Sequence, residues 1–136
     1  MTAAVVDSGV LYALFDRSDA WHPRSVAFFT AHAQDAVIPL TILGEVGYML
    51  DARLGPGAAK SLADWLSRGL VPFEGLLPQD LRRMTVLMSK YPELGFVDTS
   101  VVAIAERLMV DTIATTDRRH FTGVRPSHAE RFRLVP

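Results

Sequence analysis

The sequence contains no cysteine. This absence excludes a thiol nucleophile, thiolate-bound zinc, iron–sulfur clusters and disulfide bonds. Four histidines are present, but no two of them have a close metal-ligand spacing such as H-x-x-x-H. Any metal centre in this chain would therefore depend mainly on oxygen ligands.

Long hydrophobic runs are lacking as well. The longest stretch without a charged side chain extends only from Ser25 to Gln34, whereas a transmembrane helix needs about 20 apolar residues. We therefore expect no membrane span. The first basic residue is Arg17, so the start of the chain lacks the basic region of a signal peptide, and we expect a cytoplasmic protein.

The chain is long enough for one domain with its own hydrophobic core. It has 136 residues, of which 49% are hydrophobic and 21% are charged, a composition typical of globular proteins. We predict a single domain over residues 1–136. The net charge is −1, although residues 118–136 carry five arginines and one acid. Net charge therefore argues neither for nor against a nucleic-acid partner.

Short apolar strands alternate with helices along the sequence. The pattern predicts strands at residues 2–6, 36–38, 70–73, 112–115 and 131–135, and helices at residues 8–15, 23–33, 41–53, 58–68, 78–90 and 99–109. Asp19 is expected to cap the second helix, and Pro39 to stop the second strand. Such alternation predicts an α/β fold, with a parallel sheet covered by helices on both faces. Functional crevices in these sheets lie beyond the carboxyl ends of the strands.

Three aspartates stand at places where this crevice is expected. Asp7 directly follows the first predicted strand, and Asp117 follows the fourth. Asp98 precedes the apolar helix, where Thr99 or Ser100 would be an equally good cap. Each aspartate also has a simpler interpretation as a helix cap or turn residue.

Glu45 is harder to explain as a structural residue. Its helical neighbours three and four residues away are Thr41, Ile42, Tyr48 and Met49, a largely apolar set without a cation. A carboxylate there lies at a cleft, pairs with a positive group, or sits at a helix edge exposed to water.

Taken together, the four acids point to one site. Clustered carboxylates repel one another unless a cation neutralises them, and oxygen ligands favour Mg²⁺ or Mn²⁺. Such ions activate water and support in-line displacement at phosphorus. The hydroxyls of Ser8 and Thr116 stand beside the acids, where they could orient a carboxylate.

The sequence resembles PIN-domain proteins, and in particular toxins of the VapC type. The resemblance extends nearly from end to end, and the matching segments occur in the family's order. These segments are Val5–Phe15, Leu43–Val46, Gly95–Leu108 and Thr115–Phe121.

The resemblance implies a three-layer α/β/α sandwich and a metal-dependent endoribonuclease. It assigns the metal to Asp7, Asp98 and Asp117, with Glu45 completing the shell or acting as a base, and makes Thr115 or Thr116 their polar companion. It also implies a homodimer that a cognate antitoxin binds and inhibits.

Two surfaces follow as further predictions. For the dimer, we expect apolar side chains on helices that one small core leaves uncovered, namely Phe28, Phe29, Leu62 and Trp65. For contact with the RNA backbone, the basic candidates are Arg17, Arg118, Arg119, Arg125 and Arg133.

Other classes fit less well or remain open. A receiver-type domain needs paired acids after the first strand and a late lysine, whereas Val6 precedes Asp7 and the last lysine is Lys90. A haloacid-dehalogenase-type phosphatase needs an aspartate where Gly9 stands, and no G-x-G-x-x-G follows the first strand. A PIN nuclease in RNA processing and a non-catalytic binding module remain open, because both would use the same acids.

We interpret the histidines as structural, with substrate contact as a second interpretation for His120 alone.

Overall fold

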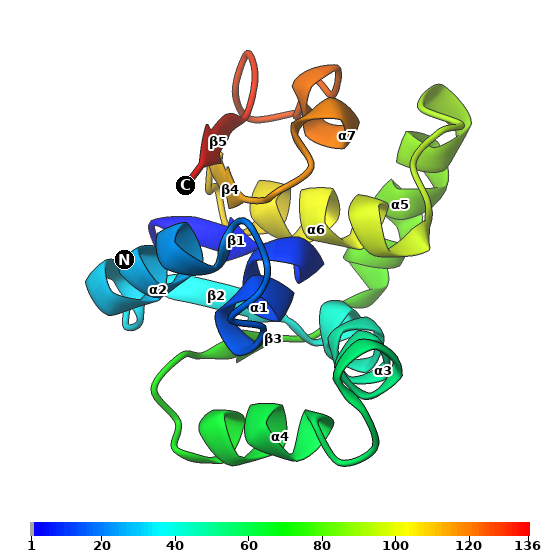
Figure 1. Cartoon of the computed structure of the whole chain (residues 1–136). Helices are drawn as coiled ribbons and strands as arrows, with labels where there is room; N and C mark the ends of the chain where they lie inside the picture. Colours follow the sequence, from blue (N-terminus) through cyan, green and yellow to red (C-terminus); the bar gives the residue numbers. More distant parts are fainter. Residues whose placement is uncertain (1) are drawn as a thin grey trace.

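The computed structural model describes residues 2–136 and contains, over that range, one five-stranded sheet and seven α-helices. All neighbouring strands are parallel, which confirms the predicted α/β class (Figure 1). The strands are β1 (Ala4–Val6), β2 (Ala36–Pro39), β3 (Phe73–Glu74), β4 (Thr112–Ala114) and β5 (Arg133–Val135). The helices are α1 (Ser8–Phe15), α2 (His22–His32), α3 (Leu43–Leu54), α4 (Ala59–Ser67), α5 (Pro78–Lys90), α6 (Phe96–Arg107) and α7 (Arg118–Thr122), with a short 3₁₀ helix η1 (Leu40–Ile42) before α3.

The strand order determines which helices cover each face. The order is β3-β2-β1-β4-β5, so the chain moves outward from β1 to β3 and then returns to the other side of β1. Right-handed crossovers therefore place α1 to α4 on one face and α5 with α6 on the other. In agreement, α1 contacts α2 and α3, while α6 contacts α5, β1 and β2.

The two strands at the centre of the sheet bring distant parts of the chain together. In the register, Val5 of β1 is paired with Val37 of β2 and with Ile113 of β4. Strand order reverses between β1 and β4, and in open parallel sheets this reversal opens a crevice at the carboxyl ends. The backbone N–H of Asp7 donates to the carbonyl of Ala114 at 2.8 Å, so the segments that follow β1 and β4 leave the sheet side by side.

The apolar sequences of β1 and of most of α6 lead to their burial. Ala4, Val5 and Val6 are buried, as a central parallel strand requires. Every residue from Thr99 to Glu106 of α6 is buried too, in keeping with the apolar sequence of this helix. Among residues 2–136, no helix has both the length and the apolarity to cross a bilayer.

Several predicted boundaries are wrong. Helix α6 begins at Phe96, because Gly95 is its N-cap in an extended conformation, so Asp98 lies inside the first turn. The third strand is only Phe73–Glu74. Strand β2 includes Pro39, which is paired with Glu74 at the strand's end.

Asp19 does not cap α2. The N-cap of α2 is Trp21, and its backbone N–H donates to Asp19 Oδ1 at 2.8 Å. Asp19 therefore stabilises the turn before the helix rather than the helix end itself.

The residues proposed for a dimer surface belong to the core of this chain. Phe28, Phe29 and Leu62 are buried, and Trp65 packs edge-on against Phe15 and Phe29 with ring centroids 5.6 and 5.5 Å apart. The prediction that these side chains are uncovered is therefore wrong for Phe28, Phe29 and Leu62, whereas Trp65 is only partly buried.

Candidate functional site

A cavity of about 520 Å³ lies beyond the carboxyl ends of β1 and β4. All four predicted acids line it, although they come from four separate segments of the chain. The lining residues are Asp7, Ser8, Gly9, Glu45, Gly95, Phe96, Val97, Asp98, Thr116, Asp117 and His120. The predicted companions Ser8 and Thr116 are thus present, while Thr115 lies directly behind the acids.

Asp7 is the most deeply buried of the acids, with 5% of its surface exposed. It occupies the N-cap position of α1 but makes no side-chain capping bond, so capping does not explain its presence. Its Oδ2 accepts a hydrogen bond from Thr115 Oγ1 at 2.9 Å. Its Oδ1 is buried and has no hydrogen-bond partner in the described part of the chain. A carboxylate oxygen in that state is a ready ligand for a cation.

Thr115 connects the two strand-end acids. Besides donating to Asp7, its hydroxyl accepts a hydrogen bond from the backbone N–H of Asp117 at 3.0 Å. Its own backbone N–H donates to the carbonyl of Val135 at 2.7 Å. The residue is fully buried, so it holds both carboxylate-bearing segments in a fixed relation.

Gly9 allows α1 to approach the loop after β4. A Cβ atom at this position would collide with Thr116 Oγ1. The absence of a side chain is therefore what permits this close contact between the two walls of the cavity.

His120 joins two of the acids. Its Nδ1 lies 2.9 Å from Asp98 Oδ2 and 3.4 Å from Asp117 Oδ2. This placement is compatible with the structural interpretation and with substrate contact. The sequence contains one signal for the contact of His120 with Asp117: the two residues are three positions apart, a spacing that makes them neighbours on a helical turn.

The carboxylates influence one another electrostatically. Burial raises the pKa of Asp7 from 3.8 to about 6. The nearby backbone N–H of Ser8 and the hydroxyl of Thr115 oppose this rise, and the charges of Asp98 and Glu45 add to it. Burial also raises the pKa of Asp98; His120 opposes the rise, and Glu45 and Asp117 add to it. A bound cation would relieve both effects, because it favours the ionised carboxylates.

The donor set fits a hard divalent cation, although the side chains are not arranged around one. Among residues 2–136, no three histidine, aspartate or glutamate side chains are positioned to hold an ion as they stand. His120 is one reason for this arrangement, because its Nδ1 contacts one carboxylate oxygen of Asp98 and one of Asp117. The free Oδ1 of Asp7 and the all-carboxylate chemistry are what Mg²⁺ or Mn²⁺ prefers.

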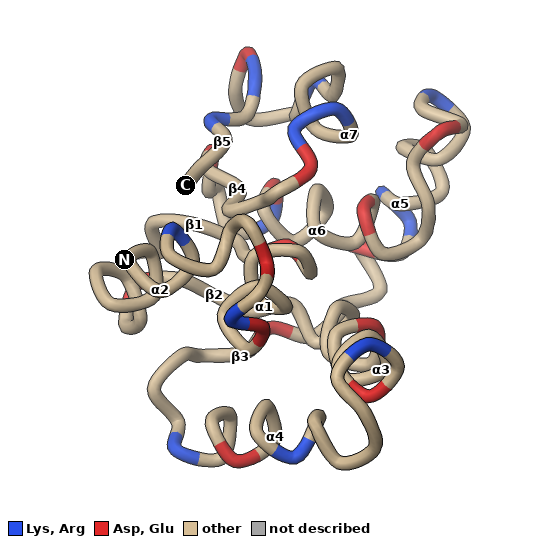
Figure 2. Tube along the Cα trace, in the orientation of Figure 1, with Lys and Arg blue, Asp and Glu red and all other residues tan. Residues whose placement is uncertain are grey.

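Only two of the five predicted RNA-contacting arginines adjoin the cavity. Arg118 and Arg119 begin α7 directly after Asp117, and Figure 2 shows this basic start of the helix next to the preceding acid. The Arg119 side chain is 92% exposed, and Arg118 donates to the carbonyl of Pro136 at 3.0 Å. Arg17 and Arg125 are exposed but do not line the cavity.

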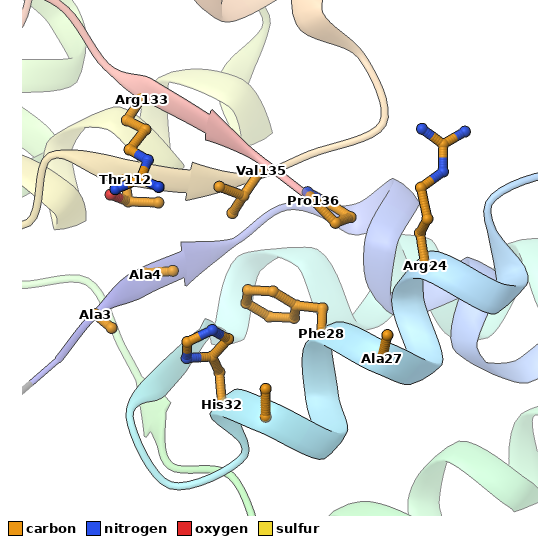
Figure 3. A pocket seen from close by; sticks show the side chains of 11 residues that line it. Ala3, Ala4, Arg24, Ala27, Phe28, His32, Thr112, Arg133, Val135 and Pro136 are labelled. Carbon is orange, nitrogen blue, oxygen red and sulfur yellow. The ribbon is translucent and has the colours of Figure 1, made fainter.

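Arg133 lines a different cavity, of about 460 Å³, between α2 and the strands β1, β4 and β5. Figure 3 shows Phe28 and His32 of α2 facing this space, with Val135 and Pro136 on the opposite side. None of the lining side chains is a carboxylate. The chemistry of the four acids therefore belongs to the first cavity, and Arg133 lies apart from it.

Replacement of Asp7 by asparagine is expected to raise the stability of the metal-free protein at pH 7.5. Since the pKa of Asp7 is about 6 in the folded state against 3.8 for the free carboxyl, the folded state binds more protons between these values. The free energy of unfolding therefore falls as pH rises through that interval. At about 1.4 kcal/mol per pKa unit, Asp7→Asn should gain up to about 3 kcal/mol at pH 7.5 and only about half of that at pH 5.

Urea unfolding with EDTA at both pH values measures this difference. Asp111→Asn, a change of the same kind at an exposed residue, is the matched control and should shift little. Equal stability of Asp7→Asn and wild type at pH 7.5 would show that the buried carboxylate carries no such penalty.

Comparison with known proteins identifies the class to which this fold and site belong. Residues 4–125 match the model of the PIN domain, and the chain therefore belongs to the PIN domain family. It is 26% identical to ribonuclease VapC26 of Mycobacterium tuberculosis over 134 residues, which cover 97% of this chain and 99% of that relative. The resemblance to VapC-type proteins is thus confirmed as a distant relationship.

Solved structures show the same fold at low sequence identity. Mycobacterium tuberculosis VapC20, described as a toxin that cleaves the sarcin-ricin loop, superimposes with a TM-score of 0.79 at 20% identity, covering 87% of this chain and 92% of that one. A toxin–antitoxin complex from Klebsiella pneumoniae gives 0.70 at 18% identity, with coverage of 90% and 92%. FitAcB from Neisseria gonorrhoeae gives 0.68 at 16% identity, with coverage of 87% and 90%.

Proposed function

We propose that this chain is a metal-dependent endoribonuclease that hydrolyses RNA phosphodiester bonds, with residues 1–136 acting as one catalytic domain. The observation that carries the proposal is the buried Asp7 Oδ1, which lacks a partner and lies in a cavity shared with three further acids. Membership of the PIN domain family and the distant relationship to ribonuclease VapC26 support it.

Each acid has a distinct role in this proposal. Asp7, Asp98 and Asp117 hold Mg²⁺ or Mn²⁺, and Glu45 completes the set or acts as the base. The ion, when bound, supplies an activated water and neutralises charge on the scissile phosphate. Thr115 keeps Asp7 and Asp117 in place through its two hydrogen bonds. Ser8 and Thr116 line the cavity and orient the carboxylates.

Arg118 and Arg119 are the candidates for contact with the RNA backbone. Four carboxylates repel a polyanion, so the substrate needs positive charge near the cavity. The arginines at the start of α7 are the predicted ones that adjoin it, and the exposed Arg119 side chain is the better placed of the two.

The proposed function is tested with purified protein and a mixed RNA substrate. We expect cleavage with Mg²⁺ or Mn²⁺ and none after chelation by EDTA, with recovery when the ion is restored. Asp117→Asn, purified in the same way, controls for contaminating ribonuclease. RNA that stays intact under all conditions would favour the non-catalytic binding module instead.

We further propose that the chain is the toxin of a toxin–antitoxin pair, acting in the cytoplasm as a homodimer. Two of the similar structures are described as a toxin and as a toxin–antitoxin complex. An antitoxin that covers the cavity would place a basic side chain among the acids, as the electrostatics favour.

Expression without a partner should therefore arrest growth and degrade RNA in the host, whereas Asp117→Asn should not. Growth that continues while the purified protein still cleaves RNA would instead indicate a PIN nuclease of RNA processing.

A further inference from the structure

Phe96 is an exposed aromatic side chain in the wall of the acidic cavity. It is the first residue of α6 and is 54% exposed, although eight consecutive residues later in the same helix are buried. A single exposed phenylalanine would need no explanation. This one lines the same cavity as Asp98, which follows two residues later in the chain.

The composition of the cavity makes this ring distinctive. Apart from Phe96 and Val97, its lining consists of acids, glycines, hydroxyl side chains and His120. A phosphodiester entering the cavity is repelled by the carboxylates and carries a base on either side. The base next to the scissile phosphate therefore needs an uncharged surface, and the face of an aromatic ring suits it.

We propose that Phe96 is a positioning residue that stacks on an unpaired RNA base beside the cavity. This inference rests on the proposed ribonuclease function and adds to it a residue that positions the substrate. Bases inside a duplex are already stacked and cannot reach the ring, whereas bases of single strands and loops can. The protein should therefore select unpaired RNA and show little preference for base identity, because every base offers a π face.

The test compares three labelled probes of about 12 nucleotides, a length that fits common single-strand site sizes. They are a single-stranded RNA, its duplex, and a chain of ribose phosphates without bases. Binding is measured by fluorescence anisotropy with EDTA at low salt, so that no probe is cleaved. Phe96→Leu removes the π face but keeps an apolar side chain, and Phe96→Trp keeps the π face. Phe73→Leu makes the same change at another exposed phenylalanine, outside this cavity, and is the matched control.

We expect Phe96→Leu to weaken binding of the single-stranded RNA about 5-fold or more, the range of one base–aromatic stack. Phe96→Trp should restore binding, Phe73→Leu should not change it, and the probe without bases should bind all variants equally. In cleavage assays, Phe96→Leu should raise KM and leave kcat nearly unchanged.

Single-stranded RNA bound equally well by wild type and Phe96→Leu would overturn the proposal, as would an equal loss for the probe without bases. If Phe96→Leu instead abolishes self-association, seen by light scattering, with RNA binding unchanged, the ring belongs to a protein contact and the proposal fails. Failure of the underlying function would look different, since wild type would then neither bind nor cleave RNA.

Discussion

Asp98→Asn should lower the rate of metal-dependent RNA cleavage by at least about 100-fold. Mutation of a residue that only supports a metal ligand already lowers metal affinity or activity about 10- to 100-fold. A neutral amide does not balance the charge of the ion, and it binds hard cations less well than a carboxylate. The fold should survive the change. Gly95, not Asp98, is the N-cap of α6, and the Thr99 hydroxyl donates to the carbonyl of Gly95 at 3.0 Å without help from Asp98.

Two measurements on the same protein separate catalysis from structure. Cleavage is measured with Mn²⁺, and the melting temperature is measured with EDTA. Since burial and neighbouring acids raise the pKa of Asp98, loss of its charge should leave the metal-free melting temperature unchanged or higher. Asp111→Asn, at an exposed residue outside the cavity, should retain full activity. An Asp98→Asn protein that cleaves RNA at the wild-type rate would remove Asp98 from the site.

The second large effect concerns stability. Arg107→Ala is expected to lower the free energy of unfolding by about 3–5 kcal/mol, the usual result of removing one partner from a buried ion pair. Arg107 Nε lies 3.0 Å from both carboxylate oxygens of Asp80, which is 2% exposed. Its other nitrogens donate to Glu74 at 2.9 Å and to the carbonyl of Gly75 at 3.0 Å. This guanidinium thus connects the end of α6 with β3 and the start of α5.

A surface arginine provides the comparison for this experiment. Arg68 forms an ion pair with Asp64 at 2.7 Å, but its side chain is 63% exposed. Exposed pairs contribute about 0–1 kcal/mol, so Arg68→Ala should change the urea midpoint only slightly. A similar small shift for both variants would show that the buried cluster does not stabilise the fold.

The sheet and most helices could be predicted because their signals are local. The boundaries of α1 and α5 are as predicted, since an apolar strand ending in Asp7-Ser8 and a proline at the first helical position are strong signals of a helix start. The start of α6 was misplaced because Gly95 is typical of a loop, and three polar residues after it were possible caps. Strand β3 has only two residues, so its extent depends on pairing with β2 rather than on its own sequence.

The same distinction applies to the site. The gathering of Asp7 and Asp117 follows from parallel strands, whose carboxyl ends share one edge. The contact of His120 with Asp98 depends on how the five-residue helix α7 packs against the rest of the chain. The hydrophobic pattern of the sequence does not predict this packing. Exposure of Phe96 and pairing of Arg107 with Asp80 also depend on tertiary packing. The ion pair of the buried Glu106 does have a sequence signal, because a charged residue in an otherwise apolar helix usually has a partner, here Arg83 at 2.7 Å.

The hydrogen bond between Thr115 and Asp7 joins residues 108 positions apart, and this has a consequence during synthesis. Asp7 is synthesised 108 residues before its orienting partner Thr115, and Asp117 follows two residues after that. Thr115 is in turn held by Val135, next to the last residue of the sequence. A nascent chain that has not yet reached β4 and β5 cannot assemble the cavity, because its walls meet only when β4 is inserted beside β1 and paired with β5. The four acids are therefore brought together only after these two strands have joined the sheet.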